Sequence, residues 1–117
     1  MKFKEILNED EFLFEMANLT KKNFKKLPAN IYISIRGNAK HGPRIKIQQN
    51  HDEKIKSKMT FSMTIPDKEI IGDIGDLDNK DIKYFENFID NNKELLINYW
   101  DNGQDMDTMD VINSLVF

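Results

Sequence analysis

The stretch "NIYISIRGNAKHGPRIKIQQN", from Asn30 to Asn50, decides the fold because it contains two alternating segments joined by a turn. Isoleucine occupies every second position in residues 31–35, and Ile45 and Ile47 repeat the pattern in residues 44–48. This period of two predicts β-strands that are buried on one face. Between them, "GNAKHGP" carries two glycines and a proline, which indicates a turn. We therefore predict a hairpin with its isoleucines facing a core and its other side chains facing outward.

Further alternating segments extend this hairpin. Residues 59–65 predict a third strand, and the side chains expected on its buried face are Met59, Phe61, Met63 and Ile65. A short fourth strand is expected at Glu69–Asp73, after the turn that contains Pro66. Because the connections are short, the strands should form an antiparallel meander. Residues 10–19, "DEFLFEMANL", fit a short amphipathic helix, although their apolar residues are dense enough for a strand as well.

The hydrophobic period changes after residue 78. Residues 79–100 place apolar side chains at helical spacing and leave a polar opposite face. Asp78 is a good N-cap, and Gly103 stands where the helix should stop. A second, shorter helix is expected in residues 105–117, capped by Asp105 or Asp107. Its apolar side should consist of Met109, Ile112, Leu115 and Val116.

The predicted fold class is α+β, an antiparallel three- to four-stranded meander covered on one face by the long C-terminal helix plus the short terminal helix. We expect one domain over residues 1–117, close to the commonest domain size. The chain has no cysteine, which excludes disulfides and thiolate metal sites and fits a cytoplasmic protein. No apolar run approaches the roughly 20 residues that span a bilayer. The abundance of Asn, Asp, Ile and Lys suggests a bacterium or a mobile element as the source.

Charge is divided unevenly along the chain. Residues 1–58 contain 13 Lys or Arg and 7 Asp or Glu, whereas residues 59–117 contain 4 Lys and 13 Asp or Glu. Such a division predicts either an electric dipole, with a basic and an acidic surface for different partners, or two halves that attract each other within the fold.

The motifs of catalysis and metal binding are weak. His41 and His51 flank a predicted strand, so they should lie near its opposite ends, too far apart to share a metal ion. The acid-rich segments in residues 73–81 and 101–110 lack the register of a calcium loop. We expect no cofactor, no metal and no enzymatic activity, and a nuclease or toxin that uses His41 is a less favoured hypothesis.

A basic surface is the stronger signal. From Lys21 to Lys58 the chain carries 11 Lys or Arg and only two acids. Outward-facing cations beside an aromatic ring and hydroxyl groups suit the binding of a phosphate backbone, and an acidic protein would fit as well. The alternative is a face that is merely solvated. The predicted partner-binding residues are Tyr32, Arg36, Lys40, His41, Arg44, Lys46 and Gln48.

Three segments carry a likeness to known proteins: "KHGPRIKIQ", "FSMTIPDKEIIGDIGDL" and "IDNNKELLINYWDN". Through them the chain, from Asn30 to Asn102, resembles a short bacterial domain-of-unknown-function family with a histidine- and proline-rich hairpin, a return strand and a helix that ends in tryptophan. The family hairpin usually carries several histidines around its prolines. This chain keeps only His41 and Pro43, and it has Arg44 where the family has a further histidine or proline. The resemblance implies a small partner gene in a toxin–antitoxin-like arrangement, and it implies no activity.

Two functions remain open from the sequence. The first is a non-catalytic module that binds an acidic protein or a nucleic acid, with direct RNA or DNA contact, through its basic sheet face. The second is a phage or mobile-element inhibitor of a nucleic-acid-guided defence nuclease, similar to an anti-CRISPR protein. It would mimic phosphates with an acidic surface made of Asp101, Asp105, Asp107 and Asp110. An unpaired sheet edge leaves room for a homodimer, and no contact with a membrane is expected.

Overall fold

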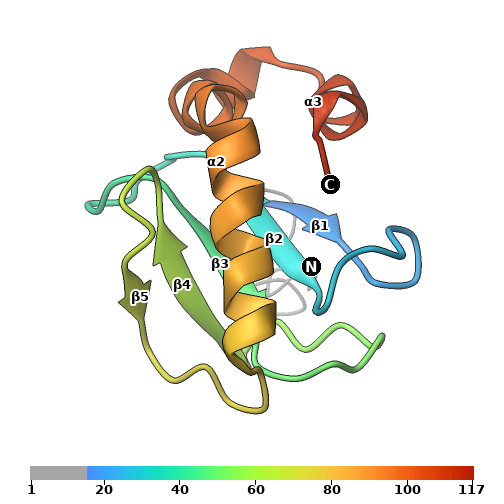
Figure 1. The fold of residues 1–117 in the computed structure, drawn as a ribbon. Helices are drawn as coiled ribbons and strands as arrows, with labels where there is room; N and C mark the ends of the chain where they lie inside the picture. Colours follow the sequence, from blue (N-terminus) through green and yellow to red (C-terminus); the bar gives the residue numbers. More distant parts are fainter. Residues whose placement is uncertain (1–15) are drawn as a thin grey trace, which may run out of the picture.

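The computed structural model describes residues 16–117 and has the predicted α+β architecture (Figure 1). Five strands form one antiparallel sheet in the order of the chain. They are β1 (Met16–Leu19), β2 (Ile31–Ser34), β3 (Arg44–Gln48), β4 (Thr60–Thr64) and β5 (Ile70–Ile71). The helices that follow are α2 (Asn79–Asn102), the 3₁₀ helix η1 (Gly103–Asp105) and α3 (Thr108–Ser114).

The register of the sheet separates the two faces as the alternation predicts. Ile45 pairs with Ile33 on one side and with Met63 on the other, which places three apolar side chains in one row. Lys46 stands in the next row, between Tyr32 and Ser62, on the opposite face. We call the face of Ile45 the inner face and the face of Lys46 the outer face.

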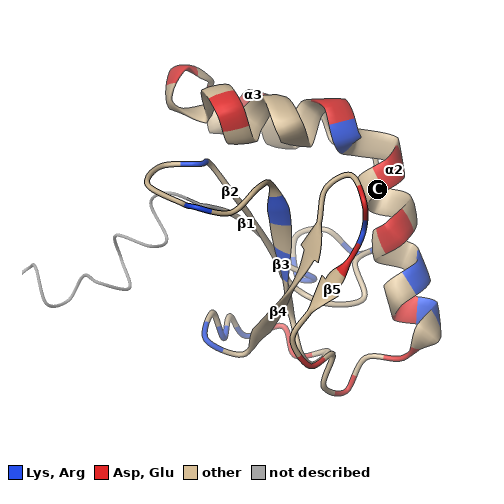
Figure 2. Cartoon of the chain, turned by 90° about the vertical axis from the view of Figure 1, so that its left-hand side faces the viewer, with Lys and Arg blue, Asp and Glu red and all other residues tan. Residues whose placement is uncertain are grey.

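The long helix α2 covers the inner face, and Figure 2 shows the outer face without a helix in the described part of the chain. The apolar side chains between the sheet and α2 supply the main stabilisation of the fold, because each Å² of apolar surface removed from water contributes about 25 cal/mol. The buried side chains of the sheet and of α2 meet in one core, which includes Leu19, Ile31, Ile33, Ile45, Ile47, Phe61, Met63, Phe85, Phe88, Ile89, Leu96 and Tyr99.

The start of α2 confirms the predicted N-cap. Asp78 accepts a hydrogen bond from the backbone N–H of Asp81 at 3.0 Å, and the Asp81 carboxylate accepts one from the backbone N–H of Asp78 at 3.1 Å. This reciprocal capping box satisfies two donors that the first helical turn leaves unpaired. The helix continues two residues beyond the predicted end, and Gly103 caps it in the right-handed region rather than with a left-handed turn.

Residues 16–19 form the strand β1, one of the two alternatives left open for residues 10–19, and residues 10–15 lie outside the described range. Several expectations about individual residues are wrong. Met59 is 45% exposed because β4 begins one residue later, at Thr60, and Met59 belongs to the turn before it. In the terminal helix the expected Leu115 is buried and Ile112 packs against the core. Met109 is exposed and Val111 is buried in its place, while Val116 lies beyond the end of α3 and is exposed. The predicted cap of this helix is Asp107, which accepts a hydrogen bond from Met109 N at 2.9 Å.

Candidate functional site: the basic outer face of the sheet

The structure divides the seven predicted partner-binding residues into two groups. Five of them are accessible: Arg36, Lys40 and His41 are exposed at the β2–β3 hairpin, and Arg44 and Lys46 are half-buried on β3. The other two, Tyr32 and Gln48, are 1% and 0% exposed. Their predicted direction, away from the isoleucines, is confirmed, but they cannot contact a partner.

Gln48 is buried because a polar loop, residues 49–59, folds over the outer face at this point. Its Oε1 accepts hydrogen bonds from the Tyr32 hydroxyl and from the backbone N–H of Lys56, each at 2.9 Å. Its Nε2 donates to Asn50 Oδ1 at 2.9 Å and to the carbonyl of Lys54 at 3.1 Å. Burial raises the pKa of the Tyr32 phenol. The alternating pattern cannot reveal this cover, since the loop comes from outside the strand.

Asn30 joins the same network and ties a second loop to the first. Its side chain accepts from the backbone N–H of Lys21 at 2.8 Å and donates to the carbonyl of Glu53 at 3.2 Å. Lys21 Nζ also donates to the carbonyl of His51 at 2.5 Å. The loops after β1 and after β3 are therefore fastened together at one end of the sheet.

Arg44 and Lys46 form the centre of the site. They lie two positions apart on β3, so both side chains stand on the outer face. Arg44 pairs across the sheet with Thr64, and Lys46 with Ser62. Burial and the neighbouring charge of Arg44 both lower the pKa of Lys46. An anion bound between the two cations would relieve this repulsion.

The hairpin between β2 and β3 packs against the C-terminal end of α2. His41 lies over the indole ring of Trp100 with the ring centroids 5.4 Å apart. Arg44 Nε donates to His41 Nδ1 at 3.0 Å, which orients the imidazole beside the cation. Arg36 donates through its backbone to the carbonyl of Trp100 at 2.9 Å, and its guanidinium forms an ion pair with Asp101 at 2.6 Å. These contacts hold the hairpin cations in place above the sheet.

The two histidines lie beyond opposite ends of β3, as predicted. His51 Nε2 contacts the Asp81 carboxylate at 2.8 Å, in the first turn of α2, whereas the His41 ring packs on Trp100 in its last turn. The two imidazoles therefore contact opposite ends of α2. Within residues 16–117 no group of three or more His, Asp or Glu side chains is arranged to hold a metal ion.

Sequence reasoning missed a second group of cations, Lys54, Lys56 and Lys58, on the loop that covers Gln48 at the outer face. The loop fastened to it through Asn30 carries four more lysines, but two of them, Lys25 and Lys26, border the C-terminal segment instead. Lys56 forms an ion pair with Asp52 at 2.8 Å, and Lys54 and Lys58 are exposed. The density of lysine was visible in the sequence, but the side chain of Gln48 that places Lys54 above the sheet was not.

Figure 2 shows how the two signs of charge are arranged in space. Lys and Arg, drawn in blue, lie on β3 and on the loops at its two ends, on the side of the sheet that faces away from α2. Asp and Glu gather on α2, on α3 and on the segments that lead into them. The ion pair of Arg36 with Asp101 joins the two halves of the chain at one end, while Lys68 pairs with Asp90 within the acidic half. This arrangement favours a dipole over internal neutralisation.

The four aspartates of the predicted acidic surface are all exposed and close together in the chain. Two of them already have structural roles: Asp101 is paired with Arg36, and Asp107 caps α3. Asp105 and Asp110 remain available. The acidic surface is therefore weaker than its sequence suggests.

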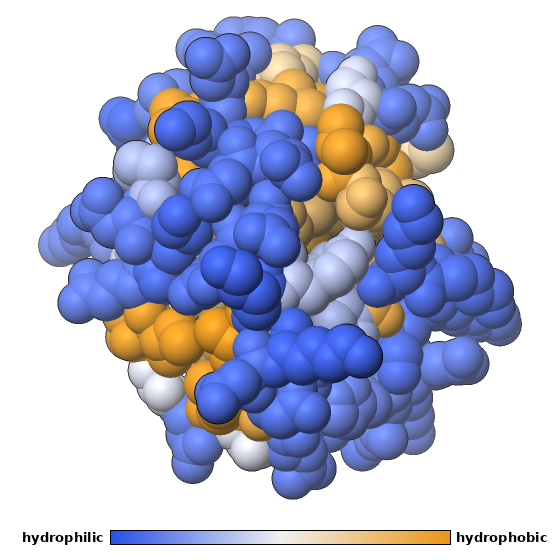
Figure 3. All heavy atoms as spheres, in the orientation of Figure 1, coloured by the Kyte–Doolittle hydropathy of each residue, from blue (hydrophilic) through white to orange (hydrophobic). Residues whose placement is uncertain are grey.

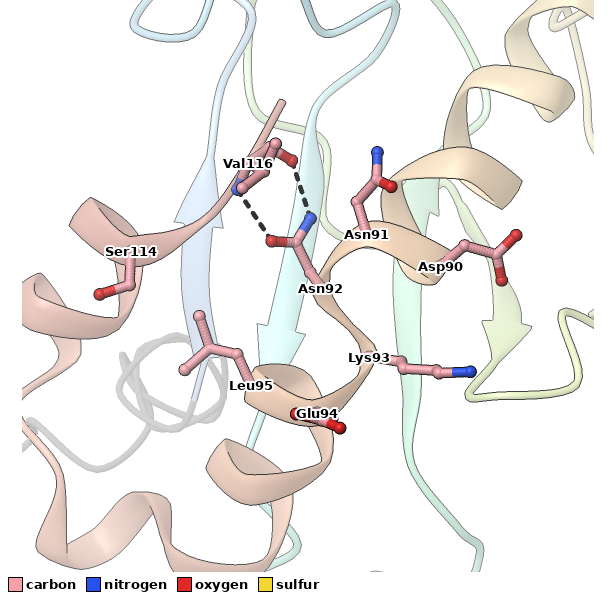
Figure 4. A pocket seen from close by; sticks show the side chains of 8 residues that line it. All are labelled: Asp90, Asn91, Asn92, Lys93, Glu94, Leu95, Ser114 and Val116. Carbon is pink, nitrogen blue, oxygen red and sulfur yellow. Dashed lines mark hydrogen bonds between the residues drawn. The ribbon is translucent and has the colours of Figure 1, made fainter.

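On the helical side, the described residues border open hollows. The surface over α2 is hydrophilic, and apolar atoms emerge at the β5 edge and between α2 and the C-terminal segment (Figure 3). A hollow of about 320 Å³ lies beside Asn92, bordered by Lys93, Ser114 and Val116 (Figure 4). No helix in the described part of the chain combines the length and apolarity needed to cross a membrane.

Comparison of the chain with protein-family models, with curated proteins and with solved structures finds no match. The resemblance to a domain-of-unknown-function family therefore stays a prediction. Any functional argument has to come from the geometry of the site.

Proposed function

We propose that the protein is a small, non-catalytic binding module whose basic outer face holds an anionic macromolecule in the cytoplasm of a bacterium. The face presents Arg44 and Lys46 on a rigid strand, with Arg36, Lys40 and His41 above them on the hairpin. A toxin–antitoxin-like or defence setting, with the chain encoded by the bacterium or by a mobile element, belongs to the same proposal.

One observation carries this proposal. Arg44 and Lys46 are adjacent cations on one face, and within residues 16–117 Arg44 forms no ion pair with a carboxylate. Within the described residues the side-chain partner of Arg44 is the imidazole of His41, which carries no negative charge. Arg36 is paired, but a solvent-exposed ion pair contributes only about 0–1 kcal/mol, so a partner's anion can replace Asp101.

The acidic surface supports the alternative, an inhibitor that mimics phosphates, less well. Asp101 and Asp107 are engaged within the fold, which leaves Asp105 and Asp110 as the accessible pair. Two carboxylates on a short 3₁₀ helix and a seven-residue α-helix form a smaller charged area than the outer face does.

The binding of polyanions tests the proposal. Fluorescence anisotropy would follow a labelled oligonucleotide and a labelled poly-glutamate peptide with the wild type and with an Arg44→Glu/Lys46→Glu variant. We expect this reversal to weaken binding of whichever anion is held by about tenfold or more. The matched control, Lys80→Glu/Lys83→Glu, changes the net charge equally on exposed positions of α2 and should change affinity by less than about twofold.

A milder variant keeps the test interpretable if the reversed strand does not fold. Arg44→Gln/Lys46→Gln removes both charges while it retains long polar side chains, and it should still weaken binding several-fold. Equal losses in the outer-face and α2 variants would contradict a local site. The absence of binding to either anion by the folded wild type would contradict the proposal itself.

A further inference from the structure

We infer that the anionic partner is a nucleic-acid duplex, contacted along its phosphates by a row of cations that follows β3 from the hairpin to the lysine loop. This inference rests on the proposed function and narrows the class of partner. Its members are Lys40 on the hairpin, Arg44 and Lys46 on β3, and Lys54 and Lys58 on the loop that Gln48 holds over the end of the strand, and each is exposed or half-buried.

Gln48 is what makes the row continuous. It stands two positions beyond Lys46 on the same face, and its buried side chain holds the carbonyl of Lys54 at 3.1 Å. The loop therefore begins its lysine series directly over the end of β3. The same side chain fixes the backbone of Lys56 at 2.9 Å, so the loop is positioned by the sheet.

The length of the row fits a groove of a duplex. From Arg44 to Gln48 the strand advances roughly 13 Å at about 3.3 Å per residue. The major groove of B-DNA is about 12 Å wide. Cations at the two ends of β3 can therefore meet phosphates on the two sides of one groove, while Lys46 lies between them.

The kind of side chain on this face favours a nucleic acid over an acidic protein. Interfaces between proteins are enriched in Tyr, Trp and Arg and depleted in Lys, and their strongest contacts come from aromatic anchors. Here the aromatic ring on the outer face, Tyr32, is 1% exposed, and Trp100 beneath His41 is 3% exposed. Most of the cations of the row are lysines, which bind phosphates as point charges.

The same lack of accessible rings favours a duplex over a single strand. Proteins that hold single strands stack the unpaired bases on aromatic side chains, at about 1–3 kcal/mol for each base. None of the Phe, Tyr and Trp side chains in residues 16–117 is exposed, and the exposed imidazole of His41 is already packed on Trp100. A duplex keeps its bases stacked internally and presents rows of phosphates along its grooves, which is the group that this face can hold.

The salt dependence of binding tests this inference. The probes are a labelled DNA duplex of about 16 base pairs, a single strand of the same length and a poly-glutamate peptide. Each contacted phosphate contributes about −0.9 to the slope of log K against log salt, so five cations predict a slope of about −4 to −5 for the duplex. In a Lys54→Gln/Lys58→Gln variant the slope of log K against log salt should become less negative by about two units, whereas the control Lys80→Gln/Lys93→Gln on α2 should keep the wild-type slope.

The outcomes separate this inference from the proposed function. Tighter binding of the duplex than of the single strand, with the predicted change of slope, supports it. Binding of poly-glutamate through Arg44 and Lys46 without binding of the duplex overturns the inference and leaves the proposed function standing. Equal affinity for both nucleic acids, or a slope that does not respond to Lys54 and Lys58, also overturns it. Binding of no probe overturns both.

Discussion

Asn92, on the long helix α2, holds the backbone of Val116 through two hydrogen bonds of 2.8 Å each (Figure 4). Its Nδ2 donates to the carbonyl of Val116 and its Oδ1 accepts from the N–H, as a neighbouring strand would. The side chain is 4% exposed, and it places Phe117 against Phe24 with the ring centroids 4.9 Å apart. One buried amide thus joins the C-terminal segment to the body of the domain.

An Asn92→Ala substitution should destabilise the protein by about 1–3 kcal/mol, because it leaves a partly buried N–H and carbonyl without partners. Urea unfolding followed by circular dichroism measures the change. Asn91→Ala is the matched control, since that side chain is exposed on the same helix, and its effect should stay within about 0.5 kcal/mol. Equal stabilities of the two variants would contradict the role given to Asn92.

Gln48→Ala should cost more, roughly 2–4 kcal/mol, since it removes the acceptor of the Tyr32 hydroxyl and of the Lys56 amide. The loop over the outer face should loosen as well, which amide hydrogen exchange in residues 50–58 would report. Gln104→Ala, at an exposed position of η1, controls for the loss of a glutamine. Unchanged exchange in the loop would show that Gln48 does not hold it.

The capping box predicts a dependence on pH. Burial of the Asp81 carboxylate raises its pKa, but hydrogen bonds from His51 and from the Asp78 backbone outweigh this effect and hold the pKa below the ordinary value of 3.8. The stabilisation from this carboxylate is therefore complete above about pH 4 to 5 and is lost as the pH falls through its lowered pKa.

Unfolding by urea between about pH 2.5 and pH 7 checks this sign. Asp81→Asn should be less stable than the wild type near neutral pH, and the difference should shrink in acid. Asp105→Asn controls for the loss of one negative charge at an exposed position. A difference that grows as the pH falls would contradict the assignment.

Gly103→Ala should destabilise the junction between α2 and the hairpin by about 1–3 kcal/mol. A Cβ at this position would lie 2.1 Å from Ile35 Cγ2, and the backbone there is ordinary right-handed helix, so the effect is purely steric. Gly42→Ala is the control, because a Cβ there meets no atom within 4 Å. Thermal unfolding of both variants measures the difference, and equal melting temperatures would show that Gly103 does not lie this close to Ile35.

Local patterns in the sequence predicted most of the fold. Alternating isoleucines placed β2 and β3, and the bounds of β3 are confirmed to the residue. Asp78 marked the start of α2 because capping is a local interaction. Residues 10–19 fitted both a helix and a strand, since the four residues of β1 become a strand only by pairing with β2. Such pairing depends on distant residues and leaves no periodic signal.

The candidate site was predicted only in part, for a similar reason. Alternation gives the face on which Gln48 and Tyr32 stand, but burial depends on the loop that folds over them. The same loop brings Lys54 to the outer face. It therefore explains both why its lysines were not predicted as binding residues and why Gln48 was wrongly predicted to be exposed. His41 on Trp100 is likewise a contact between segments about 60 residues apart, which no local pattern contains.

The central claim is that the outer face, and not the acidic helical side, holds an anion. Amide chemical shifts in a ¹H–¹⁵N spectrum, recorded while a DNA duplex is added, test it most directly. We predict shifts at Arg36, Lys40, Arg44, Lys46 and Lys54, with the amides of α3 unmoved. Shifts confined to residues 101–110, or none when either the duplex or poly-glutamate is added, would contradict the claim.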